Sequence, residues 1–97
     1  MFYKPEAEAE LKKLITEAGE AHHIYEQQNL GGKSDEGWPL WYAEYLLSHN
    51  VAQYFEEELT KEDIAEDLKA AAAGFKENLP KMSWQEYYAK FMIYDYT

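Results

Sequence analysis

The chain has no cysteine and no arginine, and each absence excludes a class of chemistry. Without cysteine there is no disulfide framework, no thiolate nucleophile and no cysteine-based zinc site. Without arginine the chain lacks the planar, bidentate side chain that proteins favour for binding phosphate and guanine. The lack of cysteine is compatible with a reducing cytoplasm.

Long hydrophobic runs are also missing, since no window approaches the roughly 20 apolar residues that span a bilayer. The first residues, Met-Phe-Tyr-Lys-Pro-Glu, lack the basic and apolar regions of a secretory signal peptide. We therefore expect a soluble, cytoplasmic protein that has no membrane partner.

Positive charge is scarce, because nine basic residues against nineteen acidic ones give a formal net charge of -10. Nucleic-acid affinity comes largely from Lys and Arg side chains that displace counterions, so we expect no nucleic-acid partner. The ordinary role of such an acidic surface is solubility. An acidic decoy that attracts a basic partner is an alternative, which requires the carboxylates to concentrate on one face.

Large aromatic residues, in contrast, are abundant: the 97 residues include four Phe, nine Tyr and three Trp. The length fits one small domain, and a hydrophobic fraction of 46% is enough for a packed core. Buried Tyr and Trp need hydrogen-bond partners, which a small core supplies poorly. We expect most of these rings in the core, with a protein interface or a small-molecule pocket as the alternatives for the remainder.

A long amphipathic helix is predicted over about residues 5–28. Proline suits its first turn, and apolar residues then recur on one face at Leu11, Leu14, Ile15, Ala18, Ala21, His22 and Tyr25. A polar, glycine-containing loop follows over residues 29–37. Trp38-Pro39 then begins a second helix, which we expect to end near residues 48–50, where Asn50 tolerates a left-handed cap.

The second half contains a similar series of helix signals. Residues 51–59 are compatible with a short connecting helix, and residues 60–63 have the pattern of a capping box before a third long helix. Leu79-Pro80 ends that helix. Residues 83–86 form a second capping-box pattern, which opens a last helix that reaches about Tyr94.

Residues 38–47 and 84–93 resemble each other at a constant offset of 46 residues, with aromatic residues and an alanine in register. Such internal similarity is typical of a doubled supersecondary unit, because one helical hairpin cannot bury its own apolar face. We therefore predict an all-α fold, a single domain over residues 1–97. It is a compact four-helix bundle-like domain of two similar hairpins, at about 5–49 and 61–95, plus a short connecting helix. An irregular packing of the same helices is the alternative.

His22 lies within the apolar stripe of the first helix, and Glu26 follows one turn later, where the two side chains can pair. His22 is either a partly buried structural residue or a proton donor or acceptor that faces a ligand. Glu20 and His23 have the Glu-x-x-His spacing of di-iron bundles. The second half lacks a matching pair, however, and both residues lie off the apolar face. We therefore expect no metal and no other cofactor.

Residues 21–26 and 35–46 together resemble a set of small uncharacterised bacterial proteins that share the pattern A-H-x-x-Y-E followed by D-x-x-W-P-x-W-Y-A-x-Y-L. The resemblance covers about the first half of the chain and implies relatedness without a mechanism. Carried over residue by residue, it points to a candidate pocket formed by His22, Tyr25, Glu26, Asp35, Trp38, Trp41 and Tyr42.

The functional interpretation that follows is a non-enzymatic interaction protein, which forms a homodimer or binds another protein. Its interface would use aromatic residues near Trp38, Trp41, Tyr45, Tyr54 or Tyr87. The alternative is a small-molecule-binding or catalytic site at the junction of the first two predicted helices. There the polar groups would come from His22, Glu26 and Asp35, and the walls from Trp38 and Tyr42. No catalytic residue is assigned.

Overall fold

The computed structural model describes residues 4–31, 37–55 and 58–96. Within these ranges the chain forms the α-helices α1 (Lys4–Asn29), α2 (Trp38–Ser48), α3 (Lys61–Asn78) and α4 (Trp84–Tyr96). A short 3-10 helix, η1 (Val51–Tyr54), connects α2 to α3. The described residues contain no strand, so the all-α prediction is confirmed.

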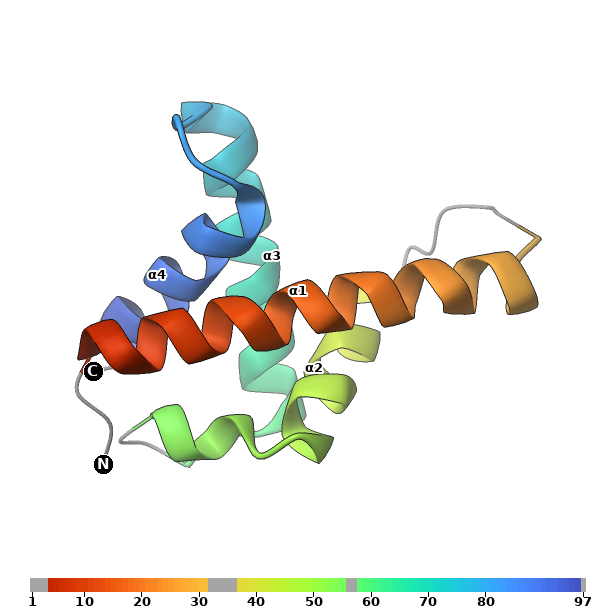
Figure 1. The fold of residues 1–97 in the computed structure, drawn as a ribbon, viewed down its shortest axis with the longest axis horizontal. Helices are drawn as coiled ribbons and strands as arrows, with labels where there is room; N and C mark the ends of the chain where they lie inside the picture. Colours follow the sequence, from red (N-terminus) through yellow and green to blue (C-terminus); the bar gives the residue numbers. More distant parts are fainter. Residues whose placement is uncertain (1–3, 32–36, 56–57, 97) are drawn as a thin grey trace.

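The four α-helices form a ring in which each one packs against two neighbours. Both α1 and α3 contact α2 and α4, and the most extensive packing joins α1 to α4 and α2 to α3. Figure 1 shows that α1 and α3 run in clearly different directions. The bundle is therefore irregular, as the alternative packing allowed. With 26 residues, α1 is long enough to span the 40 Å length of the molecule.

The core lies inside this ring and receives side chains from every helix. On α1 the buried residues recur at the predicted helical spacing, whereas Glu20 and His23 are exposed as expected. The largest side chains that are fully buried are Leu11, Ile15, Leu46, Val51, Ile64, Leu68, Met92 and Ile93. Among the described helices, none is both long and apolar enough to cross a membrane.

Local hydrogen bonds fix the ends of the helices near the predicted positions. The Asp63 amide donates to Thr60 Oγ1 at 3.1 Å, and the Thr60 amide donates to Asp63 Oδ2 at 3.0 Å, which completes the predicted capping box. At the start of α4 the Glu86 amide donates to Ser83 Oγ at 3.2 Å. Asn50 adopts the left-handed conformation with φ of 61°, which supports the predicted end of α2.

The connector between α2 and α3 differs in part from the prediction. The helix extends only over η1, and Phe55 after it is extended, with φ of −116° and ψ of 151°. Val51 and Phe55 are buried, so the segment is held by its apolar side chains. Residues 56–57 of the predicted connecting helix lie outside the described residues.

Candidate functional site

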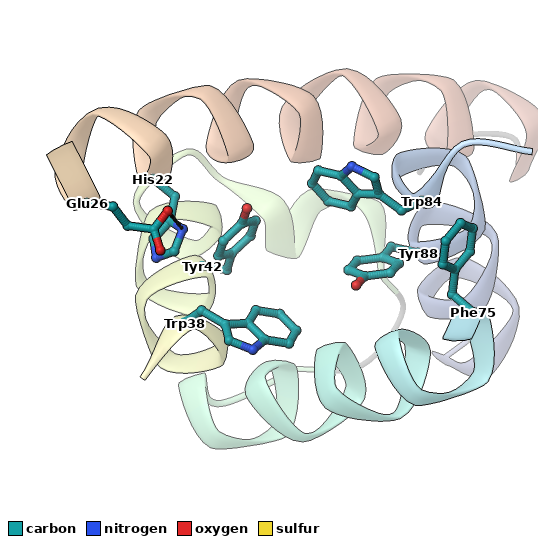
Figure 2. A pocket seen from close by; sticks show the side chains of 7 residues that line it. All are labelled: His22, Glu26, Trp38, Tyr42, Phe75, Trp84 and Tyr88. Atoms are coloured by element: carbon teal, nitrogen blue, oxygen red, sulfur yellow. Dashed lines mark ion pairs between the residues drawn. The ribbon is translucent and has the colours of Figure 1, made fainter. Parts of the chain in front are cut away.

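A pocket of about 470 Å³ lies within the ring of helices, and all four α-helices contribute to its wall. Figure 2 shows side chains directed into it from opposite sides: those of α1 and α2 on one side, and those of α4 on the other. The seven lining residues are His22, Glu26, Trp38, Tyr42, Phe75, Trp84 and Tyr88. The volume falls within the range that small-molecule sites occupy in proteins.

Two Trp–Tyr pairs form facing walls of the pocket. Trp38 and Tyr42 belong to α2, and Trp84 and Tyr88 to α4; each pair is spaced i, i+4, which places both rings on one helix face. The ring centroids lie 5.6 Å apart at 85° in the first pair and 5.1 Å apart at 65° in the second. The rings of Tyr42 and Trp84 connect the two walls, with their centroids 6.4 Å apart and their planes at 68°. These edge-to-face arrangements are the favoured geometry of aromatic contacts.

A close approach of α1 fixes the position of Trp84. Gly19 carries no Cβ, and a Cβ built there would lie 3.1 Å and 3.2 Å from two carbons of the Trp84 indole. The same position would be 3.5 Å from the Tyr42 hydroxyl. The sequence thus allows α1, Tyr42 and Trp84 to meet at one edge of the pocket because residue 19 has no side chain.

His22 and Glu26 form the polar end of the pocket on α1. His22 Nδ1 lies 3.8 Å from Glu26 Oε1, and the imidazole is buried. Its ring centroid is 4.8 Å from that of Trp41, 5.0 Å from that of Tyr42 and 6.0 Å from that of Tyr25. The imidazole is therefore held between aromatic rings, and the Glu26 side chain, 23% exposed, reaches the pocket beside it.

The tyrosine hydroxyls of the pocket are held in their neutral form. Burial, with smaller contributions from the neighbouring Tyr88 and Glu26, raises the pKa of Tyr42 to about 12. Burial also raises the pKa of Tyr88. At neutral pH both hydroxyls can donate a hydrogen bond to a ligand, and neither is suited to act as a base.

The structure brings together four of the seven residues of the candidate pocket predicted from the sequence. His22, Glu26, Trp38 and Tyr42 line the pocket together, while Tyr25 and Trp41 pack against the His22 ring and are not among the lining residues. Asp35 lies outside the described residues. Sequence reasoning did not place Phe75, Trp84 or Tyr88 in the site. The available signal was the 46-residue offset, which relates Trp38 to Trp84 and Tyr42 to Tyr88.

The lining combines five aromatic rings, two of them with neutral hydroxyls, with one imidazole and one carboxylate. In the part of the chain that the structure describes, there is no group of three or more His, Asp or Glu side chains that could hold a metal ion. The chain matches no known protein family, and no similar curated protein or solved structure was found. The resemblance based on residues 21–26 and 35–46 accordingly stays a prediction.

Proposed function

We propose that the protein binds a small molecule in the pocket between the four helices. The observation that carries this proposal is the composition of one cavity of about 470 Å³, whose aromatic walls end in a carboxylate and an imidazole. Ligand pockets in proteins commonly combine largely apolar walls with a few convergent polar groups. The rings would supply contact area, and the polar end would orient the ligand.

The alternative of self-association or binding to another protein has weaker support, because it relied on exposed aromatic residues. Trp38, Trp41, Tyr45 and Tyr54 are partly buried and pack against the core, and Tyr87 is also partly buried. The large apolar side chains exposed among the described residues are Ile24, Leu40, Leu79 and Tyr94. Ile24, Leu40 and Tyr94 belong to three different helices, and Leu79 follows α3, which favours scattered exposure over a single interface.

The test uses saturation-transfer NMR with a library of small aromatic and alkyl fragments at millimolar concentration. Two variants on α4 serve as a matched pair: Tyr88 lines the pocket, whereas Tyr87 packs against Phe75 and Phe91 at 5.6 Å and 6.3 Å between ring centroids. We expect fragment signals that Tyr88→Ala abolishes and Tyr87→Ala retains, with circular dichroism establishing that both variants are folded. Absence of any fragment signal, or equal loss in both variants, contradicts the proposal.

A further inference from the structure

The aromatic rings of the pocket present a surface that attracts positive charge. Five of the seven lining residues are aromatic, and two of these are tryptophans, whose rings bind cations best. Figure 2 shows the Trp38 indole extending into the pocket from α2, and Trp84 and Tyr88 facing it from α4. A ligand between these walls would contact rings on more than one side.

The carboxylate of the lining carries a negative charge, which would also attract a cation. Glu26 is the carboxylate of the pocket, and no lysine is among the seven lining residues. Its negative potential reaches the neighbouring wall on α2, since Glu26 is the last of the causes that raise the pKa of Tyr42. The chain as a whole carries a formal net charge of -10, which raises the local concentration of cations and repels anions.

Each other ligand class fits this lining less well. An anion would meet the Glu26 carboxylate, and His22, the lining residue that can carry a positive charge, already lies 3.8 Å from that carboxylate. A neutral ligand without a hydrogen-bond donor would desolvate the partly buried carboxylate without compensating it. A cation with alkyl groups satisfies both features at once, because its charge pairs with the carboxylate and its apolar surface lies against the rings.

We infer that the pocket binds a small organic ammonium ion, with the ammonium group held between the aromatic walls and the Glu26 carboxylate. This inference rests on the proposed binding function and names its ligand class. The volume of about 470 Å³ is that of a site for a free small molecule.

The experiment compares choline with 3,3-dimethylbutan-1-ol, which has the same shape but a neutral carbon in place of the nitrogen. Both are titrated by calorimetry into the full chain at constant ionic strength. We expect choline to bind at least about tenfold more tightly than the neutral alcohol, because only the cation gains from the rings and the carboxylate. A short peptide that carries trimethyllysine forms a third arm; tighter binding of the peptide than of choline would overturn the assignment to a free molecule.

Glu26→Gln is the diagnostic variant, and Glu17→Gln, an exposed residue of α1 outside this pocket, is its matched control for net charge. We expect Glu26→Gln to weaken choline binding by about five- to tenfold and to leave the alcohol unchanged, because only the cation interacts with the carboxylate charge. Glu17→Gln should change neither.

The outcomes separate this inference from the proposed function. Equal affinity for choline and the alcohol would overturn the ligand class and leave a small-molecule pocket. Absence of binding by both also overturns the ligand class, and the fragment experiment then decides the proposed function by itself. If Glu26→Gln and Glu17→Gln weaken choline binding equally, the role assigned to Glu26 is overturned.

Discussion

Substitution of Gly19 by alanine tests the contact that positions Trp84 at the edge of the pocket. In the interior of a helix, alanine is favoured over glycine by about 1 kcal/mol. The added Cβ, however, would lie 3.1 Å and 3.2 Å from two indole carbons of Trp84, inside the roughly 3.5–4.0 Å of normal carbon contact. The Trp84 ring also contacts Tyr42 and Tyr88, which limits its freedom to move.

The two effects oppose each other, and their sizes predict the sign. Overpacking of this kind typically costs about 1–3 kcal/mol, so the net effect of Gly19→Ala should lie between about zero and 2 kcal/mol of destabilisation. In a Trp84→Ala background the obstructing atoms are gone. The same substitution should then stabilise the fold by about 1 kcal/mol, which corresponds to a coupling energy of about 1–3 kcal/mol.

Urea unfolding followed by circular dichroism measures the free energy of unfolding of the wild-type chain, the two single variants and the double variant. The assay does not depend on Trp84 fluorescence, so it applies equally to the Trp84→Ala chains. Tyr87→Phe provides a control background, because it removes a side-chain group that lies next to a different glycine. A Cβ built at Gly74 would be 2.6 Å from the Tyr87 hydroxyl oxygen. In the Tyr87→Phe background, Gly19→Ala should lower the free energy of unfolding by the same amount as in the wild-type chain. A stabilisation of about 1 kcal/mol in the wild-type chain, without coupling to Trp84, would refute the close approach of α1.

Four further perturbations test individual features of the fold. Burial, with Tyr88 and Glu26, raises the pKa of Tyr42 from 10.0 to about 12, so between these pH values the unfolded chain loses a proton that the folded chain keeps. Stability should therefore fall as pH rises through this window, by at most about 2.7 kcal/mol from this group, and urea unfolding of Tyr42→Phe should show a correspondingly smaller loss. Thr60→Ala removes the hydroxyl that accepts from the Asp63 amide and should destabilise by about 1 kcal/mol in thermal unfolding, while Thr60→Ser should be nearly neutral; equal effects would contradict the cap. The hydrogen bond from the Thr60 backbone, followed in importance by the one from its side chain, lowers the pKa of Asp63. The stability that these bonds contribute is therefore present above the ordinary aspartate pKa and is lost as the pH falls through the lowered pKa. Asp63→Asn should make stability depend less on pH in this acid range. Leu79 has φ of 46° and is 76% exposed, so Leu79→Gly should stabilise the fold by about 0.5–1 kcal/mol and Leu79→Ala should not.

The helices could be predicted because their signals are local. The spacing of Leu11, Ile15 and Ala18 indicated the buried face of α1, and the Thr60 box indicated the start of α3. The end of η1 at Tyr54 was less predictable, because Tyr54, Phe55 and Leu59 fit a helical stripe that the chain does not continue.

The pocket required information that no single helix contains. His22 and Glu26 share one face of α1, so their pairing followed from the sequence. Phe75 lies on α3 and lines the same cavity only because the helices close into a ring. The angle at which α1 crosses the other helices depends on side-chain packing, Gly19 included, and periodicity does not specify it. The position of His22 and Glu26 on the first predicted helix pointed to the polar end of the pocket. The Trp–Tyr spacing that residues 38–47 and 84–93 share belongs to the walls of the pocket.

The most direct test of the organic-cation pocket is a titration of the 15N-labelled chain with choline, followed through the indole N–H signals of its three tryptophans. Trp38 and Trp84 line the pocket, whereas Trp41 is not among the lining residues and serves as an internal control. We predict saturable shifts of the Trp38 and Trp84 signals with a much smaller shift of Trp41. The absence of shifts, or equal shifts of all three signals, would contradict the assignment of this pocket as the binding site.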